Sequence, residues 1–492
     1  MTQTSLFAAY AEVAAARGDT PALIDADGTT LSHCALVTLA GHFAARLRAA
    51  GVTPGDRVVV QVEKSAGAVA LYLGCQQAGA VFVPLNTAYT DAEVGYFLHD
   101  CTPALFVHAP GRSALWPTSL AMGTSPADGL WAEALALESD PTITPRGPGD
   151  LAAICYTSGT TGRSKGAMIS HGNLLSNART LIDLWRFSAD DRLLHVLPIF
   201  HVHGLFVALH TALLSGAALL FEHGFDLART RARLREASVL MGVPTHYTRL
   251  LADPDFGAGD CGGVRLFISG SAPLLAEVHR QFTQRTGQVI LERYGMTEAG
   301  MITSNPHDGA RVAGTVGFAL PGVKLRVRGG DGALVGPGTT GVLEIRGPNV
   351  CSGYWQMAEA SAEAFTADGW FITGDMVTID AEGRATIVGR AKDLIIAGGF
   401  NIYPKEIEEA IDALPGVEES AVIGIAHPDF GESVVAVVVP RAGTELTPDM
   451  VLAGVQPLLA RFKHPRAVHI VPALPRNAMG KVQKAELRKI YG

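Results

Sequence analysis

The sequence predicts an α/β protein: a large N-terminal domain of parallel sheets plus a β-rich subdomain, followed by a small α+β C-terminal domain. Three observations support this prediction. Helix-like and strand-like segments alternate over about the first 140 residues. Short β segments separated by glycines run from residue 314 to residue 387, and a helix–strand–strand–helix order follows residue 390. The length of 492 residues allows about three domains.

The alternation begins with residues 39–47, whose apolar side chains recur at helical spacing. Residues 57–62 are typical of a strand, residues 66–78 of a helix and residues 80–85 of a second strand. Strand, helix and strand in succession form the unit from which parallel sheets are built. The Pro- and Gly-rich residues 141–149 predict a loop, after which the alternation resumes.

An uncharged stretch runs from residue 193 to residue 221 and is long enough to suggest a membrane span. Pro198 and four histidines interrupt it. Because polar groups are costly in lipid, we expect buried strands and a helix here.

Residues 314–387 have a different sequence pattern, in which short β segments such as 323–327 and 342–345 lie between frequent glycine turns. This pattern predicts a β-rich subdomain.

Beyond Arg390 the pattern changes again. We expect a helix at 404–414, strands at 419–425 and 434–439, and a helix at 450–461. A domain boundary therefore falls near Arg390.

The overall charge limits the partners that this chain can have. Its 39 basic and 47 acidic residues give a net charge of −8, which argues against nucleic acid and anionic membranes. Six cysteines occur without a CxxC pair, and residues 1–17 lack the basic start of a secretion signal. We therefore expect reduced thiols, a cytoplasmic location and no stable membrane insertion.

The most informative motif is a loop rich in Gly, Ser and Thr that follows a predicted strand, at residues 156–166. Converging backbone N–H groups, hydroxyls and one lysine make a phosphate cradle. Its expected phosphate-binding residues are Thr157, Ser158, Gly159, Thr160, Thr161, Gly162 and Lys165. A GxGxxG match at residues 257–262 follows no strand, so we interpret it as a surface loop.

Five further motifs follow in order, namely FHVHG at 200–204, YGMTE at 294–298, TGD at 373–375, GRAKD at 389–393 and NAMGK at 477–481. Together with the loop, they resemble the motif set of the adenylate-forming superfamily of acyl-CoA synthetases, adenylation domains and luciferases, over nearly the whole chain. The resemblance implies an ATP- and acyl-binding domain at 1–390, a mobile C-terminal domain at 391–492 and an active site between them. It also implies ATP and coenzyme A as substrates, with Mg²⁺.

The resemblance further implies a role for each motif residue. Thr297 contacts the α-phosphate, Glu298 binds Mg²⁺, and Asp375 and Arg390 contact the ribose. Lys481 bridges the acyl carboxylate and the α-phosphate. The remaining implied nucleotide-binding residues are Gly270, Ser271, Ala272, Glu292 and Tyr294. Lys392 is the implied hinge, His201 a catalytic residue lining the acyl pocket, and a lysine acetyltransferase and deacetylase are implied partners acting on Lys481.

Three stretches are similar to those of malonyl-CoA synthetases: residues 242–251, 266–274 and the Glu292-Arg293 pair before Tyr294. A guanidinium suits a second carboxylate. The likeness thus implies Arg249 and Arg293 on the distal carboxylate of malonate, with His201, Ser271 and Met301 also at the acid site. The alternative is that these arginines form internal ion pairs, for instance with Glu292.

Several functional alternatives stay open from the sequence. The small Ala299 and Gly300 after the YGMTE motif could enlarge the acid-binding pocket. Methylmalonate or a longer dicarboxylate therefore stays open as the substrate. Other candidates are a ligase for an aryl or medium-chain acid and an enzyme that loads a carrier protein. A zinc hydrolase would use His195, His201, His203 or His210.

Overall fold

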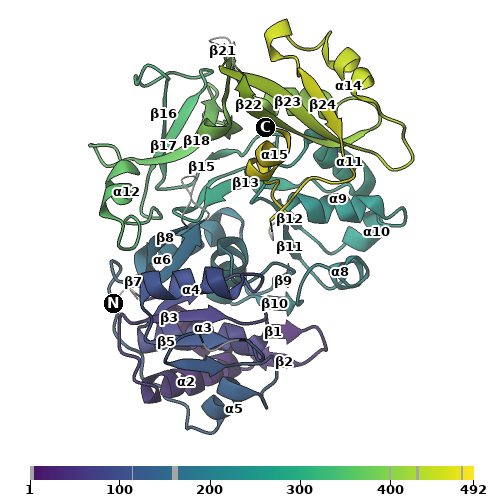
Figure 1. Cartoon of the computed structure of the whole chain (residues 1–492). Coiled ribbons are helices and arrows are strands. Elements are labelled where there is room, and N and C mark those ends of the chain that lie inside the picture. The colour runs from purple at the N-terminus through teal and green to yellow at the C-terminus, as the bar shows by residue number, and fades with distance from the viewer. Residues whose placement is uncertain (1–4, 113–114, 158–163, 398–399, 428–430, 478–479) are drawn as a thin grey trace.

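The computed structural model describes residues 5–112, 115–157, 164–397, 400–427, 431–477 and 480–492. Its strands form four sheets (Figure 1). The first is a six-stranded sheet in the order β6-β5-β3-β4-β7-β8, parallel except for the β7–β8 hairpin. Its strands are β3 (Arg57–Gln61), β4 (Val81–Pro84), β5 (Leu105–His108), β6 (Ser119–Ala121), β7 (Leu151–Thr157) and β8 (Lys165–Ser170).

The second sheet has nine strands in the order β15-β14-β13-β12-β11-β9-β10-β1-β2 and is parallel from β1 to β13. Its strands are β1 (Pro21–Asp25), β2 (Thr30–Ser32), β9 (Arg192–His195), β10 (Ala218–Phe221), β11 (Val239–Gly242), β12 (Leu266–Ser269), β13 (Leu291–Met296), β14 (Gly300–Ser304) and β15 (Phe318–Ala319). The predicted parallel α/β organisation is confirmed.

Helices cover both sheets and separate them. The helices that precede residue 300 are α1 (Leu6–Arg17), α2 (His33–Ala49), α3 (Ala66–Ala78), α4 (Asp91–Cys101), α5 (Gly129–Leu135), α6 (His171–Leu184), α7 (His210–Ser215), α8 (Leu227–Leu234), α9 (Pro244–Ala252), α10 (Ala258–Cys261) and α11 (Ala276–Thr286). Every residue of α3 is buried, and one hydrophobic core joins this helix to both sheets. This explains why the α3 sequence is apolar all round.

The β-rich segment forms a four-stranded antiparallel sheet, β16 (Lys324–Arg328), β17 (Gly341–Arg346), β18 (Phe371–Ile379) and β19 (Ala385–Arg390), with α12 (Ala358–Glu363) beside it. Its third and fourth strands pair so that Asp375 lies opposite Arg390. Two residues that are 15 positions apart in sequence thereby become direct neighbours.

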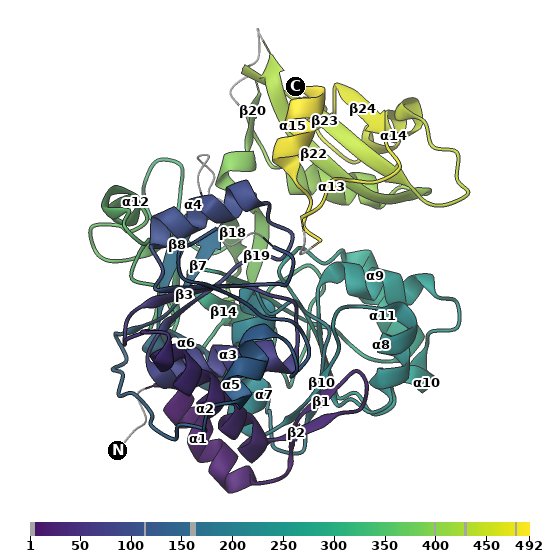
Figure 2. The same ribbon diagram turned by 60° about the horizontal axis from the view of Figure 1, so that its bottom comes forward.

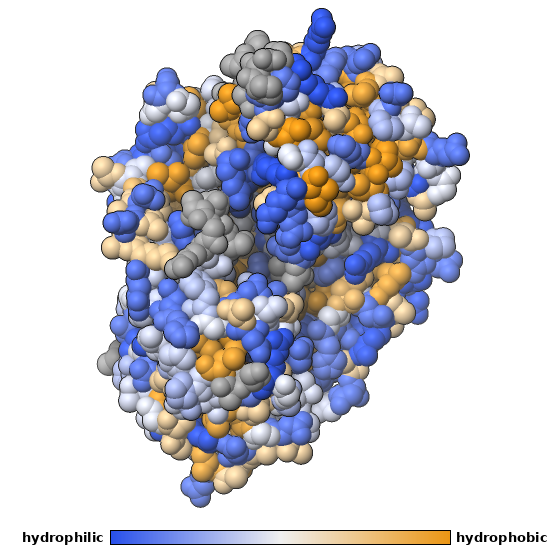
Figure 3. All heavy atoms as spheres, in the orientation of Figure 1, coloured by the Kyte–Doolittle hydropathy of each residue, from blue (hydrophilic) through white to orange (hydrophobic). Residues whose placement is uncertain are grey.

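The C-terminal sheet is formed by β20 (Ile395–Ala397), β21 (Phe400–Ile402), β22 (Val417–His427), β23 (Gly431–Pro440) and β24 (Ala467–Ile470). Its helices are α13 (Pro404–Asp412), α14 (Pro448–Val455) and α15 (Lys484–Tyr491). These elements have hydrophobic cores of their own. Figures 1 and 2 show them at the end of the molecule opposite to α1 and α2. On the face in Figure 3, apolar side chains gather over these elements.

The uncharged stretch at 193–221 forms β9, a π-helix (His203–Leu209), α7 and β10, as expected of a buried core. None of the helices in the described ranges has the length and apolar character that a membrane span requires. Residues 257–262 lie at the surface as expected, with Ala258, Gly259 and Gly262 exposed, but the loop interpretation is wrong, because residues 258–261 form the short helix α10. There the buried Asp260 pairs with Arg231 and Arg235.

Candidate active site

The base of the predicted phosphate cradle is the β7–β8 hairpin, in which Thr157 pairs with Lys165. The Lys165 ammonium lies 5.1 Å from the centre of the Tyr354 ring. The loop between the two strands includes five predicted residues that lie outside the described part of the chain, namely Ser158, Gly159, Thr160, Thr161 and Gly162.

Thr297 and Glu298 occupy the turn between β13 and β14. Glu298 is buried, and burial raises the pKa of its carboxyl. One of its oxygens accepts a hydrogen bond of 3.2 Å from the Tyr354 hydroxyl. Tyr354 therefore links Glu298 to Lys165.

Asp375 holds a buried carboxylate between two partners from the large domain. Its Oδ2 accepts from the Tyr294 hydroxyl at 2.5 Å, and its Oδ1 lies 2.7 Å from Arg390 Nε. These contacts bring together three residues that the sequence assigned to the nucleotide.

The FHVHG motif places two histidines beside the turn after β12. The backbone N–H of His203 donates to His201 Nδ1 at 3.2 Å, so the neutral His201 ring carries its proton on Nε2. His203 Nδ1 lies 3.1 Å from Ser271 Oγ, and Ser271 has a left-handed φ of +72°. Burial, Arg293 and Lys481 lower the pKa of His201 to about 4, which keeps the ring neutral.

Arg293 presents a buried guanidinium that forms no ion pair with any residue in the described ranges. Its side chain is buried, with the residue 3% exposed, and its Nε and Nη2 atoms have no hydrogen-bond partner among those same residues. Burial lowers its pKa to about 9. The neighbouring Gly270 makes room for it, because a Cβ there would lie only 2.3 Å from Arg293 Nη1.

The alternative to carboxylate binding, an ion pair of Arg293 with Glu292, is absent from the ion pairs of the described residues. Successive strand residues point to opposite faces of a sheet, and Glu292 accepts instead from the Gly314 N–H at 3.1 Å. Burial raises the pKa of Glu292 to about 7.

Arg249 does not join Arg293 through any contact recorded in the described ranges. It is exposed on α9, and its guanidinium lies 6.0 Å from the centre of the Phe225 ring. The two arginines that the sequence grouped together thus differ in burial, since Arg249 is exposed and Arg293 is buried.

Lys481 reaches this site from the C-terminal domain. The Gly480 backbone next to it is so close to α9 that a Cβ would lie 3.0 Å from Thr245 Oγ1. Desolvation and the nearby Arg390 lower the pKa of Lys481, although the residue as a whole stays exposed. Lys392 is exposed in the 3₁₀ turn that joins the two parts of the chain.

Comparison with known proteins decides the family. A sequence model described as "AMP-binding enzyme" matches residues 10–355, and one described as "AMP-binding enzyme C-terminal domain" matches residues 406–481. The chain belongs to the AMP-binding enzymes.

The structure is similar to that of ATP-bound MatB from Rhodopseudomonas palustris, with a TM-score of 0.96 and 49% identity over 100% of this chain and 99% of that one. A feruloyl-CoA synthase from Amycolatopsis sp is 36% identical over 94% of this chain and 95% of its own. A malonate–CoA ligase from Arabidopsis thaliana is 34% identical over 89% of this chain and 78% of its own.

This AMP-binding enzyme is therefore an AMP-forming acyl-CoA ligase that uses ATP, coenzyme A and a carboxylic acid. Its Mg²⁺ dependence fits the residues present, because Mg²⁺ is commonly held by one or two carboxylates together with substrate phosphates. Glu298 offers one buried carboxylate beside Thr297 and the hairpin of the phosphate loop.

The zinc alternative finds no support in the part of the enzyme that the structure describes. No group of three or more His, Cys, Asp or Glu side chains there could hold a metal. His195 and His210 instead bond to Gly204 and Tyr72 inside the core.

The sequence left open that the small Gly300 enlarges the pocket, and in the structure the space next to this glycine is occupied. The space that a side chain would take there is filled by Asn177, whose Oδ1 would lie 2.7 Å from the added Cβ. Met301 is buried and its backbone is held by the same amide. A cavity of about 10 Å³, near the minimum for one water, lies between Val202 and Thr297.

The sequence analysis did not predict two features of this site. Tyr354 lies 56 residues from Glu298, and no spacing relates them. The second feature is the bond between His203 and Ser271, since the FHVHG motif suggested only a metal pair or an acyl-pocket histidine.

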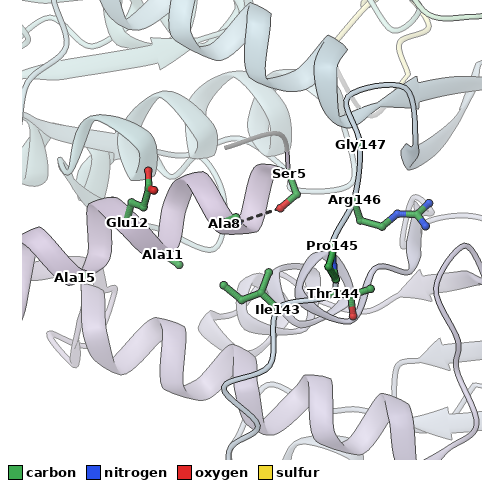
Figure 4. Close-up of a pocket in the computed structure, with 10 residues that line it drawn as sticks. All are labelled: Ser5, Ala8, Ala11, Glu12, Ala15, Ile143, Thr144, Pro145, Arg146 and Gly147. Atoms are coloured by element: carbon green, nitrogen blue, oxygen red, sulfur yellow. Dashed lines mark hydrogen bonds between the residues drawn. The ribbon is translucent and has the colours of Figure 1, made fainter. Parts of the chain in front are cut away.

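A separate groove of about 770 Å³ lies between α1 and residues 143–147 (Figure 4). Short side chains such as Ala8, Ala11 and Ala15 line its helical wall. It shares no lining residue with the predicted active site.

Proposed function

We propose that this AMP-binding enzyme ligates malonate or methylmalonate to coenzyme A through an acyl-adenylate, giving the acyl-CoA, AMP and pyrophosphate. The observation that carries the proposal is the buried Arg293 guanidinium with two unpaired nitrogens. An acid without a second negative charge leaves this guanidinium unpaired. The enzyme can therefore be about 10⁴-fold less efficient on such an acid than on a dicarboxylic acid. The name of the Arabidopsis relative supports malonate, and that of the Amycolatopsis relative is the reason to test aromatic acids too.

We assign the distal carboxylate to Arg293 rather than Arg249. Arg293 is 3% exposed and lies against Gly270, next to Ser271 in the turn after β12. Arg249 is exposed and already lies over an aromatic ring. A charge in contact with water contributes much less to discrimination than a buried one.

In the first step a carboxylate oxygen of the acid attacks the α-phosphorus of ATP, and the bond to pyrophosphate breaks. Lys481 bridges the attacking carboxylate and the α-phosphate. His201 donates a hydrogen bond from its Nε2–H to an oxygen of the acyl carboxylate, because its Nδ1 already accepts from His203. These donors offset the repulsion between the two anions.

The nucleotide roles follow the motifs. Thr157, Lys165 and the loop between them hold the β- and γ-phosphates, Thr297 holds the α-phosphate, and Asp375 and Arg390 hold the ribose. Glu298 would hold Mg²⁺, whose charge would offset that of the phosphates. Gly270, Ser271 and Ala272 are assigned to the adenine pocket, and Glu292 and Tyr294 are further nucleotide-binding residues.

In the second step the coenzyme A sulfur attacks the acyl carbon and AMP leaves. We place the domain boundary at Arg390 and the hinge at Lys392. Residues 391–492 rotate about it and withdraw Lys481 once the adenylate has formed.

A screen of AMP release tests the proposal, with ATP, coenzyme A and one acid per reaction and no carrier protein. The acids are malonate, methylmalonate, succinate, acetate, butyrate and 4-coumarate. We expect malonate or methylmalonate to exceed acetate and butyrate by about 10⁴-fold in kcat/KM. Comparable efficiency on butyrate or 4-coumarate would contradict the assignment.

Two variants make the screen specific. Arg293→Met should abolish the preference for diacids, whereas the matched Arg249→Met should change it less than about tenfold. If Arg249→Met lost the preference and Arg293→Met kept it, the exposed arginine would be the one that binds the acid.

Acetylation of Lys481 by an acetyltransferase, and a cytoplasmic location, stay predictions. Mass spectrometry of the purified enzyme, with activity measured before and after deacetylase treatment, tests the first.

A further inference from the structure

A buried lysine outside the motifs connects the two large sheets. Lys64 precedes α3, and its Nζ lies 2.8 Å from both Nδ1 and the carbonyl oxygen of His195 at the end of β9. The same ammonium lies 4.4 Å from the centre of the Phe221 ring, on the neighbouring strand β10. Burial lowers the pKa of Lys64, and the charges of Glu222 and Asp25 act in the opposite direction. Burying an amine is costly unless its hydrogen bonds are replaced, and here His195 replaces two of them.

The direction of these hydrogen bonds follows from the chemistry of the groups. His195 Nε2 lies 2.9 Å from the Gly204 carbonyl oxygen, which can only accept, so Nε2 carries a proton. Burial and Lys64 lower the pKa of His195 to about 3, so the ring is neutral and Nδ1 has no proton. Lys64 therefore donates to Nδ1 and fixes the tautomer that donates to Gly204.

This chain of bonds holds the segment that carries His201. Residues 196–203 run from the end of β9 into the π-helix, and the His195–Gly204 bond closes the segment at both ends. The closure is tight, because a Cβ on Gly204 would lie 2.1 Å from the Pro198 carbonyl oxygen. Single π-helical turns often occur at functional sites.

We propose that Lys64, acting through His195, is a positioning residue for the ligation reaction: it holds the 196–203 segment so that His201 faces the acid. Lys64 itself has no described contact with Arg293, Ser271 or Lys481. The inference rests on the proposed place of the acid beside His201.

A double-mutant cycle tests this role. Lys64→Met keeps the length of the side chain and removes its donors, and His195→Phe keeps a ring and removes both of its nitrogens. Each single variant should lower kcat/KM for the acid about 10- to 100-fold, as expected of a displacement near 1 Å, and leave the KM for ATP unchanged. The double variant should be no worse than the worse single variant, because both changes break the same chain.

Losses that multiply in the double variant, or an equal rise in the KM for ATP, would overturn the proposal. The acid in the cycle is the one that the wild-type enzyme uses best in the screen. A failure of the malonate assignment therefore appears in the screen, and a failure of the positioning role appears in the cycle.

A measurement on the wild-type enzyme covers the case in which a variant does not fold. Nitrogen-15 NMR of the histidine rings, with His195→Gln to assign the signal, reports the tautomer directly. We expect His195 to be neutral with its proton on Nε2 at pH 7. A proton on Nδ1 would refute the proposed direction of the bonds.

Discussion

The substitution Gly270→Ala places one methyl group against the Arg293 guanidinium. The new Cβ would lie 2.3 Å from Arg293 Nη1, whereas ordinary contacts start at 3.4 Å, so the guanidinium must move by 3.4 − 2.3 = 1.1 Å. A misplacement of this size can cost about 10²-fold in rate, equivalent to about 2.7 kcal/mol in the barrier. We therefore expect kcat/KM for malonate to fall about 100-fold.

The assay is AMP release, with malonate and ATP varied in separate series. Gly262→Ala is the matched control, since a Cβ there meets nothing within 4 Å. Unchanged malonate kinetics in Gly270→Ala, with a raised KM for ATP alone, would refute Arg293 as the acid-binding group. Gly270 would then act only beside the adenine.

Three further predictions concern the charged groups of the site. Lys481→Ala should slow pyrophosphate release about 10²- to 10³-fold and still convert supplied acyl-adenylate to thioester; equal loss of both half-reactions, measured separately, would contradict its role. Arg293→Met should raise Tm, because an apolar side chain replaces an unpaired buried charge; thermal unfolding without ligand measures this, and a lower Tm would show a structural role. Glu292 has a folded pKa raised to about 7, so the folded state holds the proton more tightly and stability falls as pH rises from about 4.5 to about 7. Glu292→Gln should flatten Tm over that window, and an unchanged pH profile would show that another group is responsible.

The sequence predicted the fold best for helices and strands whose own residues show a clear periodic pattern. The alternation at 57–85 became β3, α3 and β4 with bounds shifted by one residue at most. The C-terminal domain was predicted less completely, since the four-residue β24 and the helix α15 were missed. A strand as short as β24 has too few residues to show a period, and it is defined by its partner β23.

The candidate site was predicted as a set of residue types rather than as a geometry. Helical spacing can indicate that Arg249 is exposed, because the buried residues of α9 are His246, Tyr247 and Leu250, and Arg249 lies off that face. In contrast, the contact between Lys64 and His195 spans 131 residues. Nothing in either local sequence indicates it.

The contacts of Asp375 have a consequence for turnover. Both of its oxygens are already engaged by the enzyme's own Tyr294 and Arg390. A ribose that binds there exchanges existing hydrogen bonds for new ones, so the net gain in free energy is small. Most of the affinity for ATP must then come from its phosphates, and AMP, which has lost two of them, should leave readily and clear the enzyme for the next cycle.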